Sequence, residues 1–350
     1  LGPAGNIIIG IKAVSGYTED LSGNSSYFSG NITIIENQIN MSSSGSAEPI
    51  GIFYESSKLG VNMNGSSVCR SSGVMIDSNE IKGDGCGIRF DVEKIGSYLK
   101  DHASVDVGPL GIAMNDIQTD IGIDSGYFST IGCNLRGNSS SRMGNLSIND
   151  NMIRADDYGI RLNGISSLGC ALSDDAVFTW EGFGIKENDI ESGTYWISND
   201  KISDLGSGLF QNSRAYFGPI MISENRVNDS KEDRDAFNIE GMAYDMHDYS
   251  ILDFQGISFV NNTFTYSTLL AGGLTKAAYL LYDRSQARIG PLIVSRNRVN
   301  ALEKTGLEVY FGNIGYNLHD DSKVEFLGVS VDNNSVFCLR RGIFLNSIQG

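Results

Sequence analysis

Acidic side chains that recur at a fixed spacing are the first residues of this chain that could do chemistry. Asp150, Glu187 and Glu224 follow one another at intervals of 37 residues, and Asp189 stands two positions after Glu187. Carboxylates stacked at strand spacing repel one another, which favours a bound cation, a basic partner or a raised pKa. These four residues are therefore a candidate site for Ca²⁺ or for a glycan. Neighbouring basic side chains offer a simpler alternative, a solvated acidic stripe with local ion pairs.

Catalysis by these carboxylates is a further alternative. A polysaccharide hydrolase or lyase would need two or three carboxylates, or carboxylates with Arg or Lys, converging in a groove. The histidines supply no distinctive base, because His247 and His319 occupy equivalent places in HDYS and HDDS, which indicates a turn. No unit of the chain carries a large insertion that would form a cleft. We therefore name no catalytic residue, and the sequence leans against an enzyme without deciding the question.

A repeat that fills the chain positions these residues. Its period is about 37 residues, and its most regular member, which we call the anchor, is an asparagine at positions 37, 79, 115, 151, 188, 225, 262, 297 and 334. Three positions are apolar in all nine units: two residues after the anchor, and three and five residues before it. Position minus six is always Gly, Pro or Asn, minus twelve is Ser or Ala, and minus sixteen is Leu or Met. The chain is thus a repeat protein.

Each unit is predicted to contain three β-strands. Apolar residues at minus five and minus three alternate with variable ones, which is typical of a strand with one buried face. A second strand follows the anchor, as in GIRF at 87–90, and a third begins near minus twelve, where Phe178 and Trp180 alternate with polar residues. Three strands joined by turns form one coil of a parallel β-helix. We therefore predict a single all-β domain, residues 1–350, with about nine coils of about 37 residues.

The repeat units also resemble a known family. GVMIDSNEIKGDGCGIRF (73–90), GNLSINDNMIRADDYGIRL (144–162) and LGVSVDNNSVFCLRRGIFL (327–345) are similar to right-handed parallel β-helix repeats of the pectate-lyase-like superfamily. The resemblance covers essentially the whole chain and implies a right-handed coil. It also implies that the anchors stack as an internal ladder, each amide donating to one neighbour and accepting from the other. That superfamily includes lyases, hydrolases, tailspikes, adhesins and envelope proteins, so the resemblance leaves the function open. The predicted ladder consists of Asn37, Asn79, Asn115, Asn151, Asn188, Asn225, Asn262, Asn297 and Asn334.

The five cysteines lack the CxxC or Cys/His spacing of a zinc site, so no metal is assigned. Cys133 and Cys170 both stand eighteen residues before their anchors, in adjacent units. We expect them to be close neighbours, joined by a disulfide or present as two small buried thiols. These alternatives stay open at the level of the sequence.

Composition limits the partners. A net charge of -16 and a pI near 4.6 argue against nucleic acid, and no apolar run is long enough to span a membrane. The chain begins LGPAGN without Met, which suggests a processed segment. N-x-S/T sequons are frequent and indicate a secreted or cell-surface, glycosylated protein. The possible glycosylation sites are Asn24, Asn31, Asn40, Asn64, Asn138, Asn145, Asn228, Asn261 and Asn333.

Apolar residues also occur at positions expected to face outward. Met75, Met221 and Ile293 stand four before their anchors, and Ile35 and Val260 stand two before theirs, which suggests a flat face that something covers. Both ends read as coil sequence without a polar cap, so we expect them to stack on other molecules or to continue into a longer chain.

The leading hypothesis is an extracellular structural protein of a cell envelope, such as a sheath, surface-layer or filament subunit. Its partners would be copies of itself, meeting through the ends and the flat face, and it would need no cofactor. One alternative is a polysaccharide-active enzyme or carbohydrate-binding module that meets cell-surface glycans. An adhesin or tailspike stalk would share the fold and differ in its partner.

Overall fold

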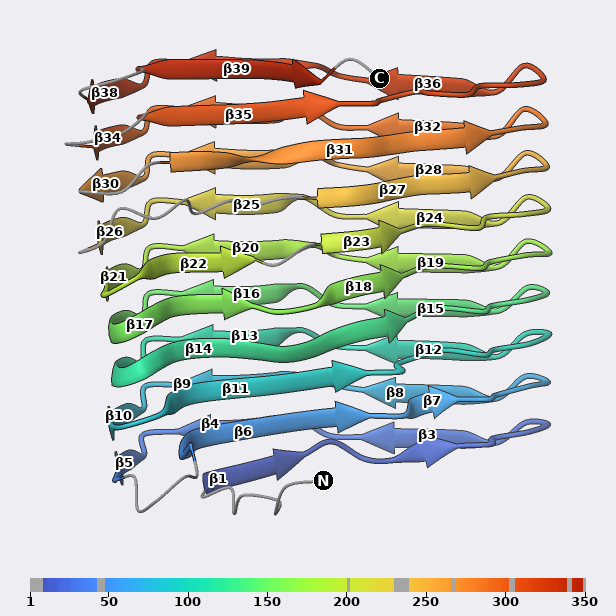
Figure 1. Ribbon diagram of the computed structural model, residues 1–350. Helices are drawn as coiled ribbons and strands as arrows, with labels where there is room; N and C mark the ends of the chain where they lie inside the picture. The colour runs from blue at the N-terminus through green and yellow to red at the C-terminus, as the bar shows by residue number, and fades with distance from the viewer. Residues whose placement is uncertain are drawn as a thin grey trace, which may run out of the picture.

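The computed structural model is a parallel β-solenoid in which the chain climbs by one coil per repeat (Figure 1). The structure describes residues 9–42, 48–199, 202–229, 239–265, 269–301, 306–338 and 342–348. The coils are numbered one to nine after their anchors. Two of the sheets contain nine strands each, so eight full turns separate the first strand from the last.

The coil is right-handed. In Figure 1 the front strands run to the right and the back strands to the left, while the chain climbs from the N-terminal to the C-terminal end. Connections between parallel strands nearly always take this hand, because a right-twisted strand leads into a right-handed crossover. The predicted fold class is confirmed: an all-β parallel solenoid with a repeat of about 37 residues and three parallel sheets.

Three sheets run the length of the solenoid. The serine sheet begins just after position minus twelve and comprises β3 (Ser26–Ser29), β8 (Val68–Ser71), β12 (Ser104–Val107), β15 (Ser140–Met143), β19 (Val177–Trp180), β24 (Arg214–Phe217), β28 (Ile251–Phe254), β32 (Gln286–Ile289) and β36 (Lys323–Phe326). The flat sheet precedes the anchors and comprises β4 (Ile32–Ile35), β9 (Val74–Asp77), β13 (Leu110–Ala113), β16 (Leu146–Asn149), β20 (Phe183–Lys186), β25 (Ile220–Ser223), β29 (Ile257–Val260), β33 (Leu292–Ser295) and β37 (Val329–Asp332).

The front sheet follows the anchors and is less regular, because most coils enter it through a short strand and continue in a longer one. Its strands are β1 (Ile9–Val14), β5 (Gln38–Met41), β6 (Ile50–Ser57), β10 (Glu80–Gly83), β11 (Cys86–Glu93), β14 (Asp116–Ile131), β17 (Met152–Leu162), β18 (Ile165–Leu168), β21 (Asp189–Ser192), β22 (Tyr195–Asn199), β23 (Ile202–Leu205), β26 (Arg226–Asp229), β27 (Ile239–Met246), β30 (Thr263–Thr265), β31 (Leu269–Leu281), β34 (Arg298–Ala301), β35 (Leu307–Gly312), β38 (Ser335–Cys338) and β39 (Ile343–Ile348). A small separate pair consists of β2 (Thr18–Glu19) and β7 (Leu59–Val61).

The core is a stack of equivalent apolar side chains. Ile76, Ile112 and Ile148 stand at position minus three of successive coils, pair directly across the flat sheet and are fully buried. A side chain at a given position therefore packs on its own copies one period away, which is why the apolar positions repeat so strictly. Among the described residues, no helix is long and apolar enough to cross a membrane.

The predicted asparagine ladder is continuous from Asn37 to Asn334. The Nδ2 atom of each anchor donates to Oδ1 of the anchor in the next coil, over 2.8–3.0 Å. The Asn188 Oδ1 atom, for example, also accepts the backbone N–H of Asn151, and the Asn151 Nδ2 atom donates to the carbonyl oxygen of Ile112. Every interior rung thus satisfies buried polar groups of its neighbours, which makes these residues structural.

The serines at position minus twelve also connect adjacent coils, but their hydroxyl groups bond to the backbone and not to one another. The Ser213 Oγ atom donates to the Leu172 carbonyl oxygen over 3.1 Å, and Ser285 donates to Met246 over 3.2 Å. Each acceptor belongs to position minus sixteen of the preceding coil. The hydroxyls therefore satisfy backbone carbonyl groups, whereas the anchors bond mainly to one another.

The residue just before every anchor has a left-handed backbone, with φ between 52° and 60° in all nine coils. None of these residues is glycine, and they include Ser78, Met114 and Arg296. Such a backbone usually favours Gly, Asn or Asp, so the residue types alone do not indicate it. The stacking of the coils imposes this corner between the flat sheet and the front sheet.

Candidate functional site

The predicted acidic patch is only partly a cluster. Asp150, Glu187 and Glu224 occupy the left-handed corner before their anchors, so they do not belong to the strand on which the sequence pattern had put them. Asp189 lies beyond the anchor, at the start of β21, where it pairs in register with Met152. All four acidic residues are exposed.

Lys186 supplies the simpler explanation of the patch. Its Nζ atom lies 2.6 Å from Glu187 Oε1 and 3.8 Å from Glu224 Oε1. Partial desolvation and the neighbouring Glu187 carboxylate raise the pKa of Asp150, whereas the hydrogen bond from Lys186 lowers the pKa of Glu187. In the described part of the chain, no three His, Cys, Asp or Glu side chains are placed to hold a metal ion. The Ca²⁺ alternative stays a prediction.

A polar groove of about 620 Å³ crosses coils two to six. Its residues follow the anchors by three to five positions, where the front sheet begins. The Asp120 carboxylate accepts the backbone N–H of Gly85 over 2.7 Å, and Arg154 Nη1 lies 3.4 Å from Asp116 Oδ1. The lining residues are Gly83, Asp84, Gln118, Thr119, Asp120, Arg154, Ala155, Asp156, Glu191, Ser192, Gly193 and Asn228.

This polar groove was missed by the analysis of the sequence, although a signal for it exists. Asp84, Asp120 and Asp156 all stand five residues after their anchors, at intervals of 36 residues. Carboxylates, amides and an arginine along a groove can hydrogen-bond to the hydroxyl groups of a sugar chain. Asn228, at the end of the groove in coil six, belongs to a sequon.

A second groove, of about 570 Å³, crosses coils six to nine, and we call it the aromatic groove. One wall is a stack of Tyr244, Tyr279 and Tyr316, whose ring centroids lie 5.5 and 5.2 Å apart with interplanar angles of 4° and 12°. The opposite wall is polar and includes the ion pair between Lys276 and Glu240, at 2.5 Å. The lining residues are Ser203, Asp204, Glu240, Gly241, Tyr244, Lys276, Tyr279, Asn313 and Tyr316.

A second aromatic stack runs three positions further along the same coils. His247, Tyr282 and His319 stack with centroid distances of 4.6 and 4.9 Å, and Phe210 extends the stack beyond His247 at 5.2 Å. The predicted equivalence of the two histidines is confirmed, because they flank the same tyrosine. Each precedes a turn, as the sequence indicated.

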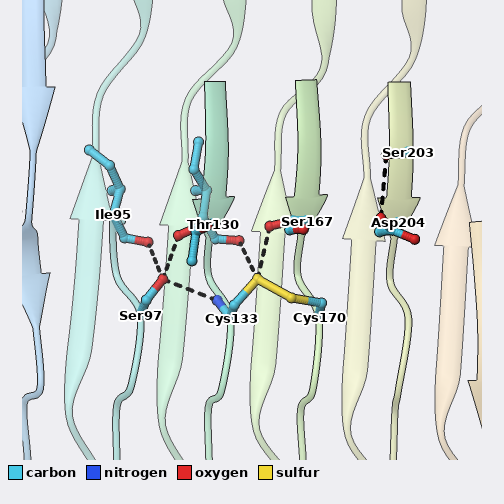
Figure 2. Close-up of a disulfide and its surroundings, with 9 residues drawn as sticks. Ile95, Ser97, Thr130, Cys133, Ser167, Cys170, Ser203 and Asp204 are labelled. Atoms are coloured by element: carbon cyan, nitrogen blue, oxygen red, sulfur yellow. Dashed lines mark hydrogen bonds between the residues drawn. A yellow bond between two sulfur atoms is a disulfide. The ribbon is translucent and has the colours of Figure 1, made fainter. Parts of the chain in front are cut away.

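Cys133 and Cys170 form a disulfide between coils four and five (Figure 2). Their Cα atoms lie 4.6 Å apart, which is the spacing of adjacent coils. Figure 2 shows Ser97 in the preceding coil, where its hydroxyl donates to the Thr130 carbonyl oxygen over 2.6 Å. The bridge occupies position minus eighteen, which holds the tyrosine stack in coils seven to nine.

Two of the remaining cysteines are buried thiols. Burial raises the pKa of Cys69 to about 11 and raises that of Cys86 as well. A thiol with so high a pKa stays protonated at neutral pH and is a poor nucleophile. These two cysteines therefore have packing roles.

A buried ion pair stabilises the front sheet of the N-terminal coils. The Asp124 side chain is 1% exposed and accepts two hydrogen bonds from Arg161, Nε to Oδ1 and Nη2 to Oδ2, both at 2.9 Å. Arg89 approaches the same carboxylate to 4.0 Å from the other side. The hydrogen bond to Asp124 raises the pKa of Arg161, which therefore remains charged.

All nine sequon asparagines have exposed side chains, so each is accessible to modification in the folded protein. Asn31 and Asn145 stand at one edge of the flat sheet, six residues before their anchors, and Asn261 and Asn333 stand at its other edge. Whether they carry glycans stays a prediction.

Comparisons with known proteins add no relative: no protein-family model, curated protein or solved structure matches this chain. The class of the protein therefore follows from its geometry alone. It is a parallel β-solenoid with an internal asparagine ladder.

Proposed function

We propose that this chain is an extracellular structural protein of a cell envelope, whose copies associate side by side through the flat sheet. The observation that carries the proposal is the outer surface of that sheet. Met75, Met221 and Ile35 are 51%, 48% and 47% exposed there. Ile293 and Val260 are half-buried in the same columns.

Small residues occupy many of the other outward positions of this sheet, and Asp77, Lys186 and Asp332 occupy others. The small residues include Gly111, Ala113, Ser147, Gly184 and Ser258, which stand at the same outward positions in other coils. Nine strands about 4.8 Å apart give a surface about 40 Å long. A long surface with exposed apolar side chains favours contact with another protein. Its backbone groups already pair between coils, so a second copy would meet it through side chains.

Two features support a location outside the cell. Disulfides persist in oxidising compartments, and Cys133 and Cys170 are joined by one. The exposed sequon residues at both edges of the flat sheet would carry glycans that border the contact surface without filling its centre.

Sedimentation of the purified chain at native salt tests this proposal. We expect the wild type to sediment as an oligomer and the double variant Met75→Glu/Met221→Glu as a monomer, because buried carboxylates would oppose the contact. Met152→Glu is the matched control, since Met152 is 42% exposed but lies on the front sheet. A wild type that stays monomeric, or a control that also dissociates, would refute the proposal.

The polar groove supports a second candidate, binding or cleavage of a polysaccharide. Asp120 and Asp156 both stand five residues after their anchors in adjacent coils, and both line the polar groove. Retaining glycosidases place their two carboxyl groups about 5–5.5 Å apart. An adhesin or tailspike stalk would share this geometry and differ in its partner.

Release of new reducing ends from a panel of neutral and acidic polysaccharides tests cleavage. We expect Asp120→Asn and Asp156→Asn to abolish any release, whereas Asp106→Asn, at an exposed ion pair with Arg142, should retain it. A wild type without activity on the panel would remove the catalytic version of this candidate.

A further inference from the structure

Two sets of repeat positions line the aromatic groove. A bend in the backbone of each coil brings them together. Position minus eighteen contributes the tyrosines, and positions minus twenty-one and minus twenty-two contribute the polar wall. Coils eight and nine each offer one tyrosine and one polar side chain, Lys276 with Tyr279 and Asn313 with Tyr316. The groove therefore presents a similar pair of groups at intervals of about 4.8 Å along the solenoid axis.

Gly241 lacks a side chain and so leaves space in the groove next to Asp204. It occupies position minus twenty-one of coil seven, where the next two coils carry Lys276 and Asn313. A Cβ atom at Gly241 would lie 3.5 Å from Asp204 Oδ1, so a side chain there would cover the carboxylate. The Asp204 carboxylate accepts a hydrogen bond from the Ser203 hydroxyl, which orients it (Figure 2), and both residues line the groove.

The polar wall also contains an acceptor that lacks a protein donor. The Asn313 Oδ1 atom is enclosed, has no hydrogen-bond partner and belongs to a residue that lines the groove. A buried acceptor without a donor is unfavourable, and a ligand hydroxyl group would satisfy it once the amide turned toward the groove. The tyrosines at the two ends of the stack, Tyr244 and Tyr316, are 43% and 44% exposed.

We propose that the aromatic groove binds a linear, neutral glycan lying along the solenoid axis. Sugar rings combine apolar C–H surfaces with hydroxyl groups, which suits a wall of tyrosines facing carboxylate and amide acceptors. Asp204 and Glu240 outnumber the single cation, Lys276, so the charge of the groove disfavours an acidic glycan.

The geometry disfavours a peptide as the occupant. An extended peptide binds by adding a strand to a free sheet edge, but here the backbone groups pair between coils. Gly208 N–H donates to the Tyr244 carbonyl oxygen over 2.8 Å, and Leu280 N–H donates to that of Tyr316 over 3.1 Å. A strand also rises about 3.3 Å per residue, which does not match the coil spacing of about 4.8 Å.

The predicted glycans of the chain itself leave this groove open. In coils six to nine the sequons are at Asn228, Asn261 and Asn333, one before or three after their anchors. None of these residues lines the aromatic groove. The proposed site is also separate from the flat sheet, so the assembly variants should bind as the wild type does.

Isothermal titration of the full chain with cellohexaose, chitohexaose and hexagalacturonate tests the proposal. We expect binding of at least one neutral hexasaccharide, and binding at least tenfold weaker in Tyr279→Ala and in Asp204→Asn. Gly241→Asn should weaken binding similarly, because it fills the hollow while keeping every groove side chain. Asparagine tolerates the left-handed backbone of this position, as Asn313 shows with φ of 51°.

Tyr249→Ala is the matched control, because Tyr249 is 55% exposed and lies outside the groove. Its affinity should equal that of the wild type, and Asp204→Asn should melt at the wild-type temperature. Failure of both neutral hexasaccharides to bind would overturn the proposal. So would preferred binding of hexagalacturonate, or an equal loss of affinity in the control.

Discussion

The side chains at position minus eighteen differ sharply between the two halves of the solenoid. In coils three to six it holds small side chains, and two of them form the disulfide between Cys133 and Cys170. In coils seven to nine it holds the stacked rings of Tyr244, Tyr279 and Tyr316. The next residue along the chain has a left-handed backbone in both halves, for example Ala171 and Asp245. The same position of the repeat therefore carries a disulfide in one half of the solenoid and a stack of tyrosine rings in the other.

The ion pairs of the front sheet show the same contrast. Asp124 in coil three is 1% exposed and has arginines on both sides, whereas Lys276 is 60% exposed and its partner Glu240 is 25% exposed. In the N-terminal half, polar groups are thus used to hold coils together. In the C-terminal half the pair of Lys276 and Glu240 lines the aromatic groove, and the following predictions test this division.

The largest effect is expected for Arg161→Met, which leaves the buried Asp124 carboxylate without its main partner. Such a loss typically costs about 3–5 kcal/mol of unfolding free energy, to be measured by urea denaturation. The corresponding change in the C-terminal half, Lys276→Met, should cost much less, because Lys276 is 60% exposed and water reaches the partly exposed Glu240 carboxylate. Equal losses in the two variants would show that the halves do not differ in this way.

Removal of the disulfide should have the next largest effect. Cys133→Ser/Cys170→Ser is expected to lower the unfolding free energy by about 2–4 kcal/mol, because the bridge closes a loop of 37 residues in the unfolded chain. A reducing agent should lower the stability of the wild type and leave the double variant unaffected. Cys338→Ser, at a half-buried free cysteine, is the control. Free thiols at both positions in the native protein would contradict the disulfide bond.

Substitutions in the asparagine ladder should cost the same in both halves. Asn188→Ala and Asn262→Ala each leave buried donors and acceptors unpaired, and we expect each to lose about 2–3 kcal/mol. Asn138→Ala, at an exposed asparagine outside the ladder, should have no measurable effect. Clearly different losses at the two rungs would mean that the scaffold itself, and not only its outward columns, differs between the halves.

The smallest effect is expected at the corner carboxylates. The raised pKa of Asp150 makes its contribution to stability fall as the pH rises through that value. The lowered pKa of Glu187 acts oppositely, since its contribution is lost as the pH falls through the folded value. Carboxyl NMR titration should therefore show the pKa of Asp150 above the ordinary Asp value and that of Glu187 below the ordinary Glu value, and Glu187→Gln should lower the pKa of Asp150. Unchanged titration of Asp150 in that variant would exclude the coupling.

The candidate sites were harder to predict from the sequence than the fold. The acidic patch was found because Asp150, Glu187 and Glu224 repeat at the period of the chain. Asp204 and Tyr244, by contrast, stand at different positions of different coils, and no motif relates them. They share a groove because the coil bends between their columns and because Gly241 lacks a side chain.

The period, the buried positions and the asparagine ladder can all be read from the amino-acid sequence alone. In a solenoid each side chain packs on its copies one period away, so the core contacts can be read from the repeat alone. Only the tertiary structure decided which outward columns meet. The left-handed corners that turn Asp150 and Asp204 outward result from the stacking of coils, and the residue types at these corners vary too much to reveal them. Grooves formed at such bends therefore depend on backbone conformation that the repeat pattern does not encode.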